Sequence, residues 1–478
     1  MASPISSTIG IGSGLNIGDI VKVLVDSDKA AKQNQITKQT TKTTDSLSAV
    51  AKLKSALTAF QDSMKTLNST TSPAFLGYAA TSSAESVVKA TANNTAVNGT
   101  YTIGVTQLAT ASKVATAALT NAQTSAIPSG DLLISQNSTN YKVTLAEGGT
   151  LQDARDAINK QLQTAGISAN IITDAEGSRL VFSSTTTGKG SDISVAGSGS
   201  VGTLLDIDGT QTMADNTVGG VKGAGAITAV AGDAAFTVDG LPITSKSNTV
   251  TAAISGLSFD LLTAGPNGTA AVSTITVATN TDGLKTSLDT FMTSYNTLVN
   301  LVGTLTKGTT DSSGVFKPAE LTGDSTAAGM LAAIRDQIAT ATTTSGLGSL
   351  AQLGITTQSN GTLSMDSAKF TAAMNDKKLA GQVQGLFSGD TGLLARVSKA
   401  IDPYTETGGI LATKTTALTK TKDNLANQQD ALDRRVESLT ASLTKKYNAM
   451  DLVVAQLKAT ASSITSMFEA MNAQKNAS

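Results

Sequence analysis

The chain has 478 residues and a formal net charge of −1, with 40% hydrophobic residues but only 3% aromatic residues. Its length suggests about three or four domains, and its balanced charge argues against nucleic acid as a partner. No apolar run approaches the roughly 18–20 residues of a membrane-spanning helix, so we expect no membrane insertion.

Cysteine and histidine are both absent. The chain therefore has no disulfide and no thiolate nucleophile, and it lacks the commonest general base and zinc ligand. No catalytic constellation is evident in the rest of the sequence. We predict that the protein is not an enzyme, that it has no catalytic, cofactor-binding or metal-binding residues, and that it uses no cofactor.

The N-terminal residues are rich in serine and glycine and predict a flexible N-terminal leg over residues 1–40. Gly10, Gly12 and Gly14 superficially resemble a phosphate-binding loop, but such a loop follows a buried strand and opens a helix, and only nine residues precede Gly10. A nucleotide site is therefore not expected. The first residues lack the features of a signal peptide, which favours a cytoplasmic protein or one exported by another route.

Segments with the apolar periodicity of helices lie on both sides of a β-rich middle part of the sequence. Residues 41–77 and 283–430 carry apolar residues at intervals of three and four, which predicts a helical stem domain. For the short run from Leu284 to Leu305, ordinary bundle packing and coiled-coil packing stay equally open. The packing residues predicted in the first segment are Leu47, Val50, Leu57, Phe60 and Met64.

Between these segments the period changes to that of strands. Residues 78–112 plus 232–282 are predicted to form an inner β-rich domain. Asn98-Gly99 predicts a tight hairpin turn after a strand at 86–92, and Asp239-Gly240 predicts another tight turn.

Residues 113–231 predict an outer α+β inserted domain. Two hairpins, over 132–145 and 169–183, flank a helix, and Thr150 with Asp153 predicts a capping box at the start of that helix. Asp206 and Asp208 resemble the start of a calcium loop, but the other ligands are missing, so a plain turn is favoured.

Leucines fall on every seventh residue from Leu411 to Leu439, and a second apolar row continues to Met471. This repeat predicts a C-terminal coiled-coil leg over residues 431–478, which needs a partner helix from this chain or from another copy. We expect it to pair with the stripe at 47–67; ordinary bundle packing is the less favoured alternative. The expected helix-packing or oligomer-interface residues are Leu425, Leu432, Val436, Leu439, Leu443, Met450, Leu457, Ile464 and Met471.

These elements predict an α+β fold, in which both chain ends form a helical coiled-coil-like stem and β-rich domains are nested between them. Several motifs stand in a specific order along it. They include Phe236–Gly240, Gly256–Phe259, Asp282–Val299, Leu353–Thr356 and Asn360–Leu363. In this order they resemble the flagellar filament cap protein family, also called flagellar hook-associated protein 2. Residues 6–15 resemble the start of that family, and residues 151–183 are similar to a small repeat of flagellins.

The resemblance implies a structural cap at the distal end of the bacterial flagellar filament. Such caps form a homo-oligomeric ring of about five or six subunits, which prevents leakage of exported flagellin and promotes its polymerisation. It further implies secretion by the flagellar type III route and an extracellular place at the filament tip. The implied partners are other copies of the chain, flagellin, the hook–filament junction protein and a flagellar export chaperone.

Three alternatives stay open from the sequence. The inserted domains of an extracellular adhesin would bind host glycans, an activity compatible with capping. A flagellin-like filament subunit would share the helical ends. A wall hydrolase would be an enzyme and would release fragments from peptidoglycan.

Overall fold

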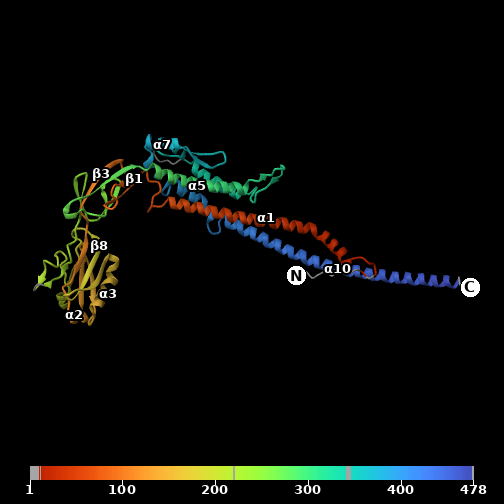
Figure 1. Cartoon of the computed structure of the whole chain (residues 1–478), viewed down its shortest axis with the longest axis horizontal. Coiled ribbons are helices and arrows are strands. Elements are labelled where there is room, and N and C mark those ends of the chain that lie inside the picture. Colours follow the sequence, from red (N-terminus) through yellow and green to blue (C-terminus); the bar gives the residue numbers. More distant parts are fainter. Residues whose placement is uncertain (1–9, 11, 219–220, 341–345, 476–478) are drawn as a thin grey trace.

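The computed structural model describes residues 10, 12–218, 221–340 and 346–475 of an elongated molecule (Figure 1). At one end, two long helices, α1 (Ile17–Leu67) and α10 (Ile410–Lys475), lie side by side. We call residues 17–43 of α1 and 419–475 of α10 the leg. A helical body, an inner β-rich part and an outer α+β part follow in that order, so the middle of the sequence lies farthest from the leg.

The body surrounds the C-terminal half of α1. Its remaining helices and short strands are α5 (Thr281–Thr306), α6 (Ser325–Ala339), η4 (Leu350–Leu353), α7 (Ser367–Asn375), η5 (Ala380–Gln382), α8 (Val383–Phe387), α9 (Leu393–Thr405), β18 (Thr309–Thr310), β19 (Phe316–Lys317), β20 (Ile355–Thr357) and β21 (Leu363–Met365). The apolar period after residue 282 predicts α5, and this prediction is confirmed. A turn at Asn360-Gly361 joins β20 to β21, which pair in antiparallel orientation.

One continuous hydrophobic core fills the body, and α1 contributes to it alongside α5 and α9. The ring of Phe60 in α1 lies 6.4 Å from the ring of Tyr295 in α5. The Tyr295 hydroxyl is buried and donates a hydrogen bond of 3.1 Å to the carbonyl of Gly361, so this core position leaves no polar group unsatisfied.

The expected pairing of the stripe at 47–67 with residues 411–471 is wrong in its register. Most of that stripe is buried in the body core, together with Leu411 and the partly buried Leu418. The leg part of α10 packs instead on the N-terminal part of α1. The physical reason is that α5 and α9 pack against the stripe inside the body, while α1 and α10 each continue as one helix beyond it into the leg.

The prediction of a flexible leg over residues 1–40 is also wrong for residues 17–40, which are helical. The side chain of Asn16 caps the helix start, and Asp26 pairs with Lys22 and Lys29 at 2.7 and 2.9 Å along its exposed face. Hydrogen bonds from these two lysines lower the pKa of Asp26 to about 2. Polar residues thus form a solvated face of a helix, where the composition had indicated flexibility. Residues 1–9 and 11 lie outside the described residues.

The inner part contains two antiparallel sheets. Their strands are β1 (Tyr78–Ser82), β2 (Val88–Ala92), β3 (Gly99–Gln107), β13 (Ala234–Val238), β14 (Leu241–Ser245), β15 (Thr249–Ile254), β16 (Leu257–Leu261) and β17 (Ala271–Thr279), with the short helix η3 (Pro266–Gly268) before β17. The strand orders are β1-β17-β3-β13-β14 and β15-β16-β2. A shared core joins the sheets, and in it Phe236 meets Phe259 edge to face at 5.7 Å.

The two tight-turn predictions of this part have different outcomes. Asp239 and Gly240 have φ values of 48° and 84° and join β13 to β14, as the prediction requires. The prediction of a hairpin at Asn98-Gly99 is wrong, because its flanking strands do not pair with each other: β2 pairs with β16, while β3 pairs with β17 and β13. The Asn98 side chain donates instead to the Thr279 hydroxyl at 3.2 Å. A local turn signal could not reveal that its flanking strands belong to different sheets.

The outer part has its own hydrophobic core. Its elements are β4 (Ala111–Ala115), α2 (Asn121–Ser125), β5 (Gly130–Gln136), β6 (Thr139–Leu145), α3 (Leu151–Leu162), η1 (Gln163–Ala165), β7 (Ile167–Thr173), β8 (Ser178–Thr187), β9 (Ser194–Gly197), η2 (Gly199–Val201), α4 (Gly202–Leu205), β10 (Thr217–Val218), β11 (Val221–Lys222) and β12 (Gly225–Ala226). The larger sheets have the orders β12-β4-β8-β7 and β6-β5-β9. The two predicted hairpins and the capping box of Thr150 and Asp153 are confirmed.

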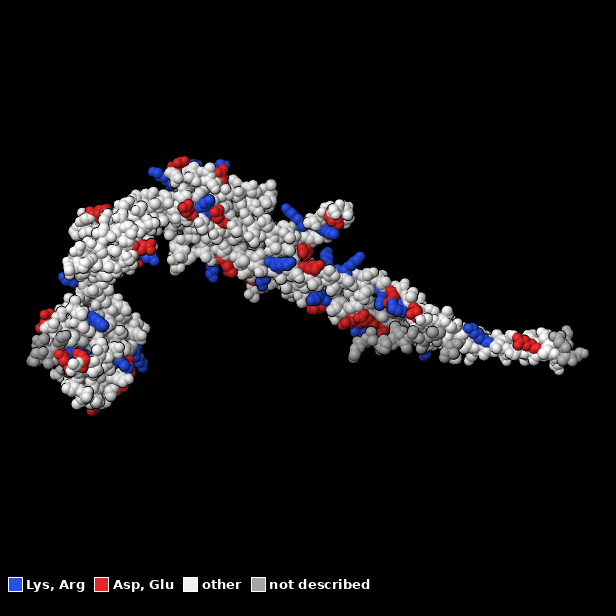
Figure 2. Space-filling view, viewed as in Figure 1, with Lys and Arg blue, Asp and Glu red and all other residues white. Residues whose placement is uncertain are grey.

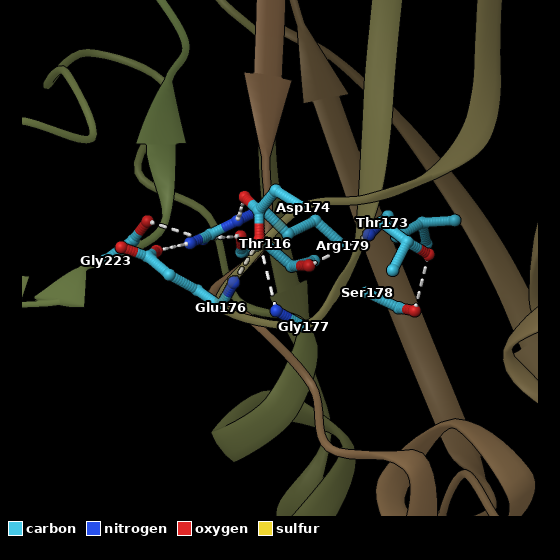
Figure 3. Close-up of polar contacts among 9 residues, drawn as sticks. Thr116, Thr173, Asp174, Glu176, Gly177, Ser178, Arg179 and Gly223 are labelled. Atoms are coloured by element: carbon cyan, nitrogen blue, oxygen red, sulfur yellow. Dashed lines mark hydrogen bonds and ion pairs between the residues drawn. The ribbon is translucent and has the colours of Figure 1, made fainter.

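A buried arginine ties three segments of the outer part together (Figure 3). The Nε of Arg179 donates to Asp174 at 2.9 Å, its Nη2 donates to Glu176, and its Nη1 donates to the carbonyl of Thr116 at 3.1 Å. Nη1 also lies 3.5 Å from the carbonyl oxygen of Gly223. The hydrogen bond from Arg179, followed by the backbone amide of Glu176, lowers the pKa of Asp174. Because the guanidinium is buried, these partners offset the free-energy cost of removing its charge from water.

Candidate functional site: the helical leg

Apolar side chains join the two helices of the leg in antiparallel orientation. Ile17, Val21 and Val25 of α1 are buried against α10, at intervals of four residues. We call this contact the leg seam; its residues on α10, each half-buried, are Val436, Leu439, Leu443 and Tyr447. The seam is one residue wide on α1, so it buries far less apolar surface than the body core does.

Polar contacts set the register beside the seam. The side-chain amides of Gln33 and Gln429 bond each other at 2.8 and 3.0 Å, and Arg435 donates two hydrogen bonds, of 3.0 and 2.9 Å, to the carboxylate of Asp28. Exposed pairs of this kind contribute only about 0–1 kcal/mol each. They therefore specify the alignment of the helices more than they stabilise it.

A more buried ion pair connects the start of α10 to the body. The ammonium group of Lys414 contacts the carboxylate of Asp324, whose other oxygen accepts the amide of Thr326 at 2.8 Å and so caps α6. Burial alone would raise the pKa of Asp324, but the hydrogen bonds from Lys414 and Thr326 outweigh it, and the pKa is lowered.

Substitutions at Asp324 should separate the cap from the ion pair. We expect Asp324→Ala to lose both and to lower the free energy of unfolding of the body by about 1–2 kcal/mol, whereas Asp324→Asn keeps a capping oxygen and loses less. Because the pKa is lowered on folding, this contribution is complete above the ordinary value of 3.8 and fades as the pH falls below it. Denaturant unfolding of the three proteins at pH 7 and pH 3 measures it. Equal losses in the Ala and Asn variants would show that the cap contributes nothing.

The predicted interface residues occupy three environments. Val50, Leu57, Phe60 and Met64 lie in the body core, with Leu47 half-buried at its edge. Leu425 and Leu432 are buried, and Val436, Leu439 and Leu443 belong to the leg seam. The last four are exposed: Met450 by 48%, Leu457 by 64%, Ile464 by 49% and Met471 by 58%.

The exposed residues continue the heptad row beyond the seam. Residues 448–475 extend α10 by about 42 Å, and between 452 and 474 only Lys458 and Glu469 are charged. We call the apolar row on this segment the open stripe; it consists of Met450, Val453, Leu457, Ile464, Met467, Phe468 and Met471, all exposed. Figure 2 shows that the leg ends in a segment with few charged side chains, while small groups of acidic and basic side chains are scattered over the rest of the visible face. An exposed apolar row of this length is typical of an interaction surface.

Sequence reasoning missed part of this surface. Val453, Met467 and Phe468 flank the heptad positions and broaden the stripe, which a strict seven-residue count passes over. The α1 side of the seam was missed as well, although Ile17, Val21 and Val25 show the four-residue interval of a helix face. The apolar residues Ile20, Val23 and Leu24 between them obscured that interval.

The acidic residues that resemble a calcium loop serve local backbone contacts. Asp206 accepts the amide of Gly197 at 2.6 Å, and Asp208 accepts the amide of Thr210 at 3.0 Å. Among the described residues, no group of three or more acidic side chains converges as a metal site requires. Within the same ranges, no helix combines the length and apolar character needed to cross a bilayer.

Comparison with known proteins assigns the chain to one family over nearly its whole length. Residues 13–112 match the family described as "Flagellar hook-associated protein 2 N-terminus", and residues 231–459 match the one described as "Flagellar hook-associated protein 2 C-terminus". Residues 131–186, in the outer part, match the "Flagellin hook IN motif".

Individual relatives agree with this. The chain is 36% identical over 475 residues to the A-type flagellar hook-associated protein 2 of Pseudomonas aeruginosa, covering 95% of this chain and 96% of that protein. It is 30% identical over 486 residues to flagellar hook-associated protein 2 of Salmonella typhimurium, covering 98% and 99%. Its fold is similar to the crystal structure of the D1-D2-D3 domains of the flagellar cap protein FliD from Escherichia coli, with a TM-score of 0.58, 29% identity and coverage of 78% and 99%.

These similarities do not favour the adhesin or the flagellin-like subunit as alternatives. The predicted α+β architecture, with a helical stem and nested β-rich parts, is confirmed. The chain belongs to the flagellar hook-associated protein 2 family.

Proposed function

We propose that this chain is the structural cap at the distal, extracellular tip of the flagellar filament, where it works as a homo-oligomer that retains exported flagellin and promotes its polymerisation. The observation that carries the proposal is the open stripe, added to membership of a family whose solved members are named flagellar cap proteins. Among the described residues, none covers this long apolar helix face, which favours a partner from another molecule. A cap that assembles around a filament end supplies such partners.

The leg has two kinds of contact, and we assign them different tasks. The leg seam holds α1 and α10 of one chain together, while the open stripe packs against helices of other chains. The stripe offers an oligomer interface through Met450, Leu457, Ile464 and Met471, and its partners are other copies or flagellin. Contact with a hook–filament junction protein or with an export chaperone stays an expectation from the family resemblance, and contact with host glycans belongs to the adhesin alternative.

The same proposal covers the division of the chain. We assign residues 41–77 with 283–430 to the stem, 78–112 with 232–282 to the inner domain, 113–231 to the outer domain and 431–478 to the C-terminal leg. We also propose that the protein is not an enzyme, since its sequence lacks cysteine and histidine and shows no other catalytic constellation.

Removal of the open stripe tests the assembly proposal. Native mass measurement should show the full chain as a closed oligomer, and the same chain ended after Tyr447 should give mainly the free subunit. The truncation leaves the body core and the leg seam complete, so helix content and thermal unfolding of the body serve as controls. An oligomer of the same size and affinity in the truncated chain would show that copies associate through another surface.

A further inference from the structure

The glycine-rich segment before α1 folds against the flank of α10. The amide of Gly10 donates to the carbonyl of Leu15 at 2.9 Å, and the amide of Gly14 donates to the carbonyl of Gly10 at 2.8 Å, which closes the segment into a compact loop. The loop surrounds one carboxylate, that of Asp451, which lies just beyond the leg seam. We call residues 10 and 12–15 together with Asp451 the terminal clasp.

Three hydrogen bonds fix this carboxylate. The amides of Gly12 and Ser13 donate to its two oxygens at 3.0 and 2.7 Å, and the hydroxyl of Ser13 donates to the second oxygen at 2.5 Å. The hydrogen bond from the Ser13 hydroxyl, followed by the two amides, lowers the pKa of Asp451. Bonds from several donors to one ionised group are among the stronger hydrogen bonds in proteins.

Two glycines are required for the approach to α10. A Cβ on Gly10 would collide with the Asp451 carboxylate, and a Cβ on Gly12 would collide with the backbone of α10 and lie 2.6 Å from the Cβ of Ala455. The glycines that superficially resemble a phosphate loop therefore do hold an anion. The anion belongs to the protein's own last helix.

We propose that the terminal clasp is an end lock for the leg, which fastens the start of α1 to α10. The body core holds the other half of α1, and the pairs Gln33–Gln429 and Asp28–Arg435 set the alignment of the two helices. Toward its start, α1 has only the thin seam of Ile17, Val21 and Val25. The clasp adds a carboxylate held by three donors at the end of that seam, where fraying of α1 would begin.

The clasp also determines where residues 12–15 lie. At 100° per residue, Asp451 lies about 120° and Ala455 about 160° around the helix from Leu457. The segment is thereby held on the flank of α10 and away from the open stripe. Leu15 would otherwise add its exposed side chain to the apolar surface that the stripe offers.

Hydrogen exchange on the intact free chain tests the lock without any assembly step, so its failure is distinct from a failure of the proposed function. In Asp451→Asn, the amides of Gly12 and Ser13 should exchange at least about tenfold faster than in the unmodified chain. Ser13→Ala should give a smaller increase, because both amide bonds remain. Gly12→Ala should open the loop as Asp451→Asn does, whereas Gly303→Ala, where a Cβ meets nothing within 4 Å, should not.

Asp423→Asn is the matched control, since Asp423 is an exposed aspartate on the same helix, about 42 Å from the clasp. It should leave the exchange of Gly12 and Ser13 unchanged. Unchanged protection in Asp451→Asn, or an equal loss of protection in Asp423→Asn, would overturn the proposal. Helix content of each variant, measured by circular dichroism, verifies that α10 is intact.

Discussion

Replacement of Leu457 and Ile464 together by aspartate should abolish filament growth and motility while leaving the folded subunit unchanged. Both side chains are about half or more exposed, by 64% and 49%, so the free chain loses little on substitution. In an assembly that buries the open stripe, two unpaired carboxylates would be transferred out of water, which is strongly unfavourable. Complementation of a strain that lacks its cap protein, scored by soft-agar motility and by filament length in electron micrographs, measures the effect.

The matched control for this experiment places the same charges elsewhere on the same segment. Ser462 and Ser466 lie on the opposite side of α10 from Leu457, and both are exposed. Their double aspartate variant should support normal motility. Normal motility of the Leu457→Asp, Ile464→Asp variant would show that filament growth does not depend on the open stripe. Loss of motility in the serine control would point to net charge, independent of the face that carries it.

Leu57→Ala should destabilise the body by about 2–5 kcal/mol, since this side chain is 0% exposed in the body core and its removal leaves a cavity. Leu452→Ala on the leg is the control; Leu452 is 61% exposed and should change the stability by less than about 0.5 kcal/mol. Hydrogen exchange followed region by region in increasing denaturant separates the parts of the molecule. Protection of α5 should fall in Leu57→Ala, while protection of β8 in the outer part stays the same.

This second expectation depends on the separation of the hydrophobic cores. The body, the inner part and the outer part each have their own set of buried residues. If β8 lost protection in Leu57→Ala to the same extent as α5, the three cores would unfold as one cooperative unit. The independence inferred from their packing would then be wrong.

The sequence predicted the elements whose signals are local. The capping box of Thr150 and Asp153, the turn at Asp239-Gly240 and the apolar period of α5 each depend on neighbouring residues, and each is present. The turn at Asn98-Gly99 failed, because sheet membership is decided by strands more than 150 residues away, such as β16 and β17. The residues next to a turn contain no information about pairing between such distant strands.

The candidate site was predictable in its chemistry but not in its pairing. The heptad row identified α10 as a packing helix, yet it could not distinguish positions filled by this chain from positions left open. Leu432 and Leu457 belong to rows of the same seven-residue period, but Leu432 is buried, whereas Leu457 lies beyond the part of α10 that packs on the start of α1 and is exposed. The clasp was unpredictable for a similar reason, because its donor loop and its carboxylate are about 440 residues apart.

The antiparallel leg imposes an order on folding. Its contacts join residues 396 to 439 positions apart in the sequence, so the thin seam forms at low entropic cost only after the body core has brought α1 and the start of α10 together. The outer and inner parts contain mostly nearer contacts and can form before the C-terminal residues are available. The leg is then the last section to form and the first to open. A chain that is exported unfolded therefore folds its other parts before α1 and α10 pair in the leg.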